Sequence, residues 1–62
     1  MTYKEEQGMT LEEMIREINR FIEQYDGTAI GGIIKNWRQN TRDDDYDGIE
    51  AIYNELEAHG YV

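Results

Sequence analysis

Hydrophobic side chains recur at steps of three and four residues along most of this chain, which is the spacing of amphipathic helices. The first run predicts a helix over residues 11–25. Asp26 and Gly27 follow it, and glycine readily takes the left-handed conformation found just past a helix end. The hydrophobic positions of the run are Leu11, Met14, Ile15, Ile18, Phe21, Ile22 and Tyr25.

The start of this first helix has two matching signals. Thr10 and Glu13 have the spacing of a capping box, in which the threonine hydroxyl accepts from a backbone N–H of the first turn. Met9 and Met14 have the spacing of a hydrophobic staple around the same start. Residues 1–8 lack helical periodicity, so we expect a flexible arm there.

The second run predicts a helix over residues 29–39, with Thr28 as its cap. Gly31 and Gly32 oppose this interpretation, because each glycine weakens a helix interior by roughly 1 kcal/mol relative to alanine. A β-turn followed by a short strand at Ile33 and Ile34 is the competing interpretation. We favour the helix and leave open whether the glycine pair lies in the helix or in a turn. The hydrophobic positions are Ile30, Ile33, Ile34 and Trp37.

The third run predicts a helix over residues 47–59. Asp47 and Glu50 have the spacing of a second capping box, and Gly60 stands at the expected end. The last two residues, 61–62, are expected either to fold back onto the core or to pair as a short strand with residues 2–4. The hydrophobic positions of this run are Ile49, Ile52, Tyr53 and Leu56.

Three amphipathic helices joined by short connections predict an all-α fold, most simply a small antiparallel three-helix bundle. We expect one helical domain over residues 9–62, preceded by the arm of residues 1–8. A chain of 62 residues without cysteine has no disulfide to support a small core, so helices shared across a homodimer are an open alternative. The expected core is Leu11, Ile15, Ile18, Ile22, Ile30, Ile33, Ile34, Trp37, Ile49, Ile52 and Leu56.

Composition argues against several classes of chemistry. The chain has no cysteine and no serine and only one histidine, so thiolate metal sites are excluded and nucleophilic catalysis would depend on threonine. Exposed carboxylates without an enclosed cleft do not acquire the shifted pKa values that acid–base catalysis needs. We therefore expect no enzymatic activity and no cofactor. No apolar run approaches the ~18 residues of a membrane span, so a cytoplasmic protein without membrane contact is expected.

The charge is unevenly distributed. The formal net charge is −8, and the residues from Asp43 to the end contain seven carboxylates and no lysine or arginine. The sixteen residues before them contain Lys35, Arg38 and Arg42 and no acid. Such an excess repels nucleic acid and attracts basic protein surfaces. The three basic residues are a small surface for direct nucleic-acid binding, and we expect them to neutralise part of the acidic segment across the loop.

The acidic segment also resembles half of a calcium-binding loop. Asp43, Asp45 and Asp47, followed by Gly48, match the first ligand positions of an EF-hand. The second half does not match, because Asn54 stands where a bidentate glutamate is required. A degenerate calcium-binding helix-loop-helix is therefore the weakest alternative, and no metal ligands are assigned.

The preferred hypothesis is that the acidic segment binds a basic protein surface. The carboxylates of the third helix fall on one face, and a row of carboxylates can imitate the charge of a nucleic-acid backbone. A nucleic-acid-binding enzyme would be a suitable partner, and small acidic helical chains are a common format for phage-encoded inhibitors of such enzymes. This is an analogy of size and charge only. The alternative function is a homodimeric structural or assembly protein. The expected partner-binding residues are Asp43, Asp44, Asp45, Asp47, Glu50, Glu57, Tyr46 and Tyr53.

Overall fold

The structure is a computed structural model that describes residues 9–62, and these residues form three helices and no strand. The helices are α2 (Leu11–Gln24), α3 (Ala29–Gln39) and α4 (Tyr46–Ala58). The all-α class is confirmed for this part of the chain, and the helix bounds lie within one residue of the predicted ones. The predicted arm of residues 1–8, and the alternative strand pairing with residues 2–4, lie outside the described residues.

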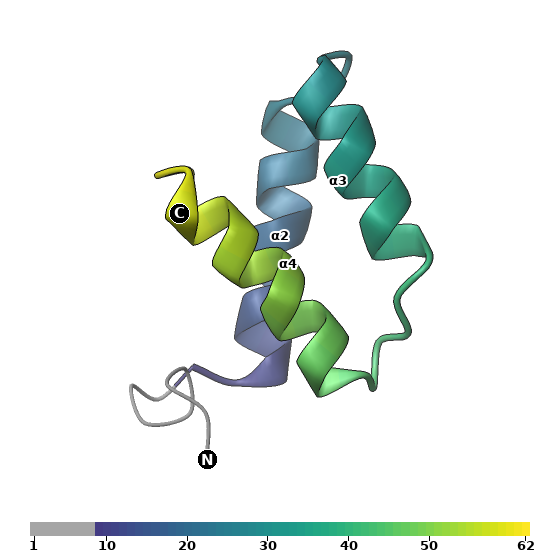
Figure 1. Ribbon diagram of the computed structural model, residues 1–62, viewed down its shortest axis with the longest axis vertical. Coiled ribbons are helices and arrows are strands. Elements are labelled where there is room, and N and C mark those ends of the chain that lie inside the picture. Colours follow the sequence, from purple (N-terminus) through teal and green to yellow (C-terminus); the bar gives the residue numbers. More distant parts are fainter. Residues whose placement is uncertain (1–8) are drawn as a thin grey trace.

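The three helices pack as a compact unit (Figure 1). α2 and α3 lie next to each other and run in opposite directions, and α4 crosses α2 at a slant. The contact between α2 and α4 is the most extensive of the three, followed by that between α2 and α3. The more detailed assignment, an antiparallel three-helix bundle, stays a prediction.

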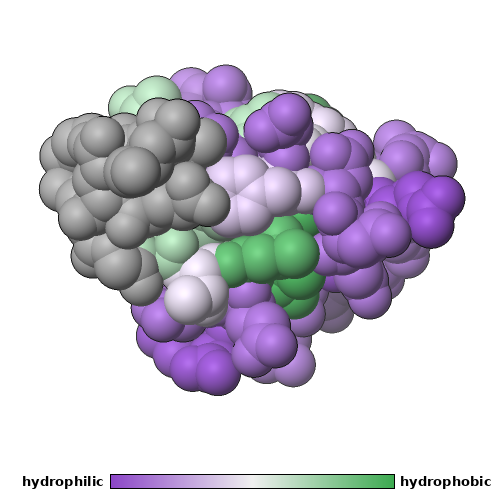
Figure 2. Space-filling model, turned by 90° about the horizontal axis from the view of Figure 1, so that it is seen from below, coloured by the Kyte–Doolittle hydropathy of each residue, from purple (hydrophilic) through white to green (hydrophobic). Residues whose placement is uncertain are grey.

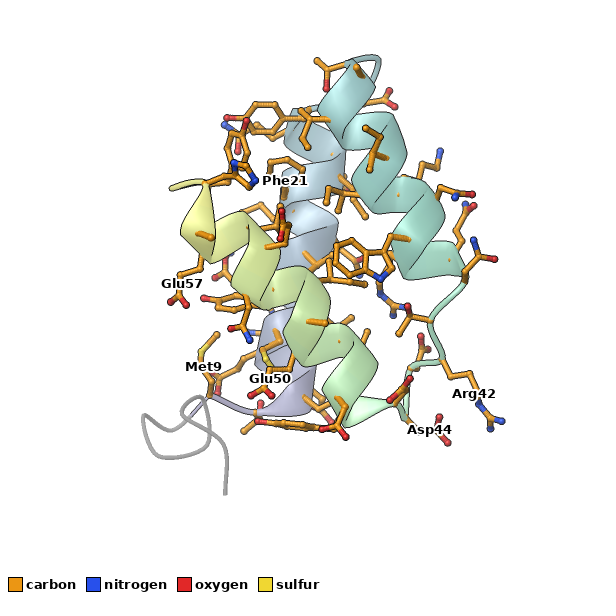
Figure 3. The ribbon with its side chains drawn as sticks, in the orientation of Figure 1. Met9, Phe21, Arg42, Asp44, Glu50 and Glu57 are labelled. Atoms are coloured by element: carbon orange, nitrogen blue, oxygen red, sulfur yellow. The ribbon has the colours of Figure 1, made fainter. Side chains whose placement is uncertain are left out.

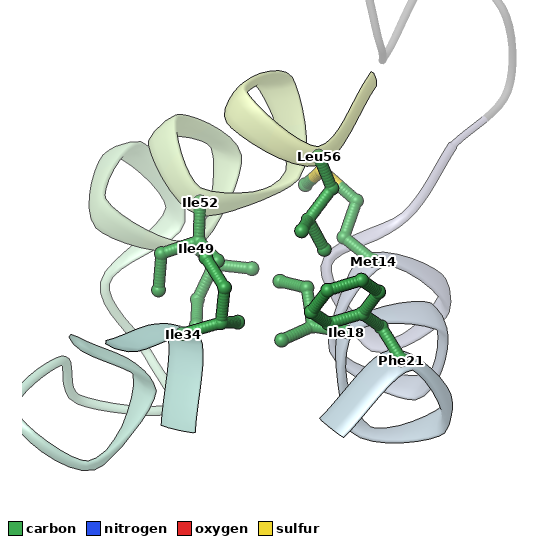
Figure 4. Close-up of a cluster of buried hydrophobic side chains, with 7 residues drawn as sticks. All are labelled: Met14, Ile18, Phe21, Ile34, Ile49, Ile52 and Leu56. Atoms are coloured by element: carbon green, nitrogen blue, oxygen red, sulfur yellow. The ribbon is translucent and has the colours of Figure 1, made fainter. Parts of the chain in front are cut away.

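Seven hydrophobic side chains are buried where the three helices meet (Figure 4). Three come from α2, one from α3 and three from α4, so α3 contributes least to the centre. Each is worth roughly 1.5–3 kcal/mol when fully buried. The seven are Met14, Ile18, Phe21, Ile34, Ile49, Ile52 and Leu56.

The predicted core needs correction at several positions. Ile33 was expected inside but is 61% exposed, whereas Met14 and Phe21 are buried and were not in the predicted core. The hydrophobic positions of α2 extend further around the helix than α3 and α4 together cover. The position of α4 therefore determines which of these positions are buried. Five predicted core residues are only partly buried around the centre: Leu11, Ile15, Ile22, Ile30 and Trp37. Hydrophobic side chains accordingly reach the surface between hydrophilic ones (Figure 2).

The start of α2 is as predicted. The backbone of Thr10 is extended, and its Oγ1 accepts a hydrogen bond from the N–H of Glu13 at 3.1 Å. Met9, one residue before the cap, packs against the core that contains Met14. A threonine cap of this kind stabilises a helix by about 1 kcal/mol.

The connection between α2 and α3 is a four-residue turn. The N–H of Thr28 donates to the Tyr25 carbonyl at 3.1 Å, and Gly27 has a φ of 85°, which a turn with glycine at its third position requires. Thr28 Oγ1 also donates to the Tyr25 carbonyl at 2.6 Å and accepts from the Gly31 N–H at 3.0 Å. This hydroxyl therefore joins the end of α2 to the start of α3.

The glycine pair lies within α3, so the alternative of a turn and strand at Ile33 and Ile34 is wrong. The two glycines have different surroundings. A Cβ on Gly31 would overlap the Tyr25 carbonyl oxygen, which is backbone and cannot move aside. A Cβ on Gly32 would meet nothing within 4 Å. The close approach of α2 to α3 thus explains why position 31 is a glycine, but it does not explain the glycine at position 32.

The start of α4 differs from the prediction. Its N-cap is Asp45, whose Oδ1 accepts from the Gly48 N–H at 3.1 Å, so the predicted capping box of Asp47 and Glu50 is wrong. Acidic caps are possible at both Asp45 and Asp47, and packing selects between them. Tyr46 packs against the core, and α4 includes this residue as its first position.

α4 ends in a Schellman motif that returns the chain to α2. Gly60 has a φ of 79°, and its N–H donates to the Glu57 carbonyl at 3.0 Å. The N–H of Tyr61 donates to the Leu56 carbonyl at 2.9 Å, completing the motif. The Tyr61 ring lies 5.0 Å from that of Phe21 and 5.3 Å from that of Tyr25, between centroids. The expectation that the C-terminal residues fold back onto the core is confirmed for Tyr61.

Candidate functional site

The acidic segment begins in the connection between α3 and α4, and Arg38 holds this connection. Arg38 Nη1 donates to the Thr41 carbonyl at 3.0 Å, and Nη2 donates to Asp43 Oδ1 at 2.6 Å. The Arg38 side chain is only 14% exposed, whereas the Asp43 side chain is 83% exposed. The arginine is therefore an anchor inside the loop, and it neutralises the first aspartate from beneath.

A second ion pair lies at the outer edge of the same loop. Arg42 Nε is 3.2 Å from Asp44 Oδ1, and both side chains are largely exposed and project from the loop (Figure 3). Exposed pairs of this kind contribute about 0–1 kcal/mol to stability. They still compensate charge locally. The third aspartate, Asp45, uses a carboxylate oxygen to cap α4.

These contacts confirm that two of the three basic residues neutralise part of the acidic segment. Arg38 and Arg42 are paired with carboxylates, so Lys35 is the one exposed cation of the stripe without an ion pair within residues 9–62.

The carboxylates of α4 have a different environment from those of the loop. Asp47 is exposed and Glu50 is partly buried, and neither is in an ion pair within the described part of the chain. Glu50 and Glu57 lie along one edge of α4, on the side away from Asp44 and Arg42 (Figure 3). α4 contains no lysine or arginine that could compensate them.

The two tyrosines predicted at this surface are not simple surface residues. Tyr46 and Tyr53 are partly buried and pack against the core, and both already interact with another group of the chain, as does Glu57. Of the eight predicted site residues, the structure therefore leaves Asp47 and Glu50 as the carboxylates without an assigned role within the described residues. The sequence predicted that basic residues neutralise this loop, because Arg42 immediately precedes the aspartates and Arg38 is five residues before Asp43.

The remaining candidate chemistries find little support in the geometry. Helix α4 begins at Tyr46, inside the would-be calcium loop, and Asp43 and Asp45 serve as ion-pair partner and helix cap. Among residues 9–62 no group of three or more histidine, cysteine or acidic side chains is arranged to hold a metal ion. His59 Nε2 lies 3.1 Å from Glu55 Oε1, but both side chains are about half exposed at the end of α4.

Two further findings concern membrane-spanning helices and similarity to known proteins. None of the helices within residues 9–62 has the length and apolar character required to cross a bilayer. Comparison with models of protein families, with curated proteins and with solved structures found no match to this chain.

Proposed function

We propose that this chain is a non-enzymatic protein-binding module that docks the outer face of α4 on a basic protein surface. The observation that supports this proposal most directly is the contrast in charge compensation. Asp43 is paired with Arg38 of α3 and Asp44 with Arg42 of the loop, whereas Asp47 and Glu50 have no ion pair within the described residues. Within the acidic segment, the uncompensated charge is therefore carried by α4.

Electrostatics favour a basic partner over other classes of ligand. A net charge of −8 repels phosphate groups and attracts cationic surfaces over distances of about a Debye length, ~8–10 Å at physiological salt. Attraction of this kind raises the association rate and is weakened by salt. Asp47 and Glu50 would fix where on this molecule the partner binds.

We extend the proposal to the kind of partner. In an antiparallel three-helix bundle, α4 would present its carboxylates as a row on a rigid support, imitating the charge of a nucleic-acid backbone. The complementary surface is a basic groove that normally binds nucleic acid. A chain bound in this groove would inhibit the partner protein. Phage-encoded inhibitors of this size and charge provide the analogy, which has no sequence motif behind it.

The test compares two double variants with the same change in net charge. Asp47→Asn/Glu50→Gln removes the uncompensated carboxylates of α4, and Asp43→Asn/Asp44→Asn removes the compensated ones of the loop. Each is titrated with a decalysine peptide by NMR at low and high salt. We expect the α4 variant to lose several-fold more affinity and to show the smaller salt dependence.

A competition experiment tests the nucleic-acid-like character of the surface. Basic proteins captured from a cell lysate by the immobilised chain are challenged with duplex DNA, which should displace a partner held at a nucleic-acid site. Equal losses in the two double variants would contradict the assignment to α4, because they would show that only total charge matters. Captured proteins that duplex DNA does not release would contradict the mimicry.

A further inference from the structure

The exposed face of α3 differs in charge from those of the other helices. Each helix has six exposed residues, and four are charged in α2 (Glu12, Arg16, Arg20, Glu23) and three in α4 (Asp47, Glu55, Glu57). In α3 only Lys35 is charged, and it stands at one edge of the exposed face. The others form what we call the uncharged face of α3: Ala29, Gly32, Ile33, Asn36 and Gln39. Depletion of charge in an exposed patch is typical of the centre of a protein interface.

Two neighbouring residues give this face its shape. Ile33 is 61% exposed, the largest exposed fraction among the big hydrophobic side chains of the described residues. Gly32 beside it is exposed, lies in the helix interior, and would meet nothing within 4 Å if it had a Cβ. Packing within a single chain therefore explains neither the hydrophobic side chain at position 33 nor the glycine at position 32. Together they place an exposed hydrophobic side chain, a protrusion, next to a helix position that has no side chain, which we call the notch.

We propose that the uncharged face of α3 binds the same face of a second copy of this chain. A protrusion beside a notch is self-complementary under a two-fold rotation, which is the usual symmetry of a homodimer. With the two α3 helices antiparallel, Ile33 of each copy lies over Gly32 of the other. Asn36 and Gln39 then stand beside this contact with amide groups able to hydrogen-bond across it.

The charge distribution favours this face over those of the other two helices as the contact between copies. Two copies with a net charge of −8 repel each other wherever carboxylates meet. The segment from Gly27 to Arg42 contains no acid, and α3 lies at the outer edge of the molecule (Figure 1). Glu50 and Glu57 lie on the side of α4 away from α3 (Figure 3). α3 is thus the helix where approach of a like-charged copy is opposed least.

The size of the face determines the strength of the association. A stable interface buries about 800 Å² on each partner, and a helix of eleven residues is only about 16 Å long. One face of such a helix covers a fraction of that area. We therefore expect a weak dimer that forms at high micromolar to millimolar concentration.

Sedimentation equilibrium from micromolar to millimolar concentration tests this assignment. The average mass of the wild-type chain is expected to rise from 7.3 kDa towards twice that value, and to rise further at high salt, which screens the repulsion between copies. This salt dependence is opposite in sign to that of the proposed docking on a basic partner. Failure of either proposal can therefore be recognised separately.

Matched variants locate the contact. Ile33→Glu is expected to abolish the mass increase, whereas Gln24→Glu makes the same charge change at an exposed position of α2 and should associate like the wild type. Gly32→Gln fills the notch without changing the charge and should also remain monomeric. A constant mass of one chain at millimolar concentration and high salt would overturn the proposal, as would wild-type association of both α3 variants.

Disulfide trapping tests the antiparallel arrangement, because the chain has no cysteine of its own. When Ile33 lies over Gly32 of the second copy, Ala29 faces Asn36 of that copy. The double variant Ala29→Cys/Asn36→Cys is expected to give covalent dimers on oxidation, since two positions two helical turns apart are too distant to bond within one chain. Covalent dimers from Asp47→Cys/Asn54→Cys but not from the α3 variant would place the contact on α4 and overturn the proposal.

Discussion

The two connections between the helices are similar in length but are held together in different ways. The turn between α2 and α3 is closed by backbone groups and one hydroxyl: Thr28 bonds to the Tyr25 carbonyl, and Gly31 packs against the same carbonyl. The loop between α3 and α4 also has backbone bonds, such as the one from the Asp45 N–H to the Arg42 carbonyl at 3.1 Å. It differs from the turn in that charged side chains hold it as well, with Arg38 beneath it and Asp45 at the start of α4.

This difference indicates which positions of the two connections tolerate substitution and which do not. Where α3 begins beside the turn, Gly31 has no room for a Cβ against the Tyr25 carbonyl, so sterics restrict this position to glycine. The loop depends on ion pairs whose outer members are exposed, so several of its side chains can change at little cost. In the proposed function, the carboxylates that the loop compensates contribute less to partner binding than those of α4. The predictions below test this contrast.

The largest effect is expected at the turn. Gly31→Ala forces a Cβ into the Tyr25 carbonyl, and the helix must move away from α2 or the turn must open. We expect a loss of about 3 kcal/mol or more in the free energy of unfolding, enough to unfold a domain of this size. Thermal denaturation followed by circular dichroism measures it. A wild-type melting temperature would show that α2 and α3 are not packed as closely as described.

A smaller loss is expected from the anchor of the loop. Arg38→Met keeps the hydrophobic stem but removes the bonds to Thr41 and Asp43, with an expected cost of about 1–2 kcal/mol. The matched control is Arg42→Met, whose pair with Asp44 is exposed and should be worth less than about 0.5 kcal/mol. Urea denaturation of both variants compares them. Equal destabilisation would mean that burial of Arg38 gives it no special role.

The cap of α4 provides a third comparison within the acidic segment. Asp45→Ala should cost about 1 kcal/mol, because the Gly48 N–H loses its acceptor. Asp47→Ala removes the same charge two residues later and should change stability by less than half as much. The melting temperatures of the two variants show which aspartate contributes more to the stability of α4. The reverse order would restore Asp47 as the cap.

The smallest effect is expected to be a gain. Gly32→Ala places a methyl group in open space within α3, so helix propensity should stabilise the isolated chain by up to about 1 kcal/mol. This variant is also the control for Gly31→Ala, since the same substitution at adjacent positions has opposite expected signs. A loss of stability measured on dilute protein would show that Gly32 has an intramolecular role that the structure does not reveal.

Local signals in the sequence were sufficient for the helices and two of their caps. The hydrophobic steps predicted all three helices to within one residue, and the caps at Thr10 and Thr28 were identified correctly. These features depend on hydrogen bonds between residues three or four positions apart, so the sequence alone contains the information. The candidate site was less predictable, because charge compensation depends on which side chains face one another.

The sequence by itself therefore determined the helical class, the uneven charge and the absence of cysteine chemistry. The tertiary structure decided which edge of each stripe is buried, that Asp45 and not Asp47 caps α4, and that Arg38 neutralises the loop. It also decided that Ile33 lies outside the core beside Gly32. The reason is geometric, since periodicity fixes the angular position of a residue on its own helix but does not fix where the neighbouring helices lie around it.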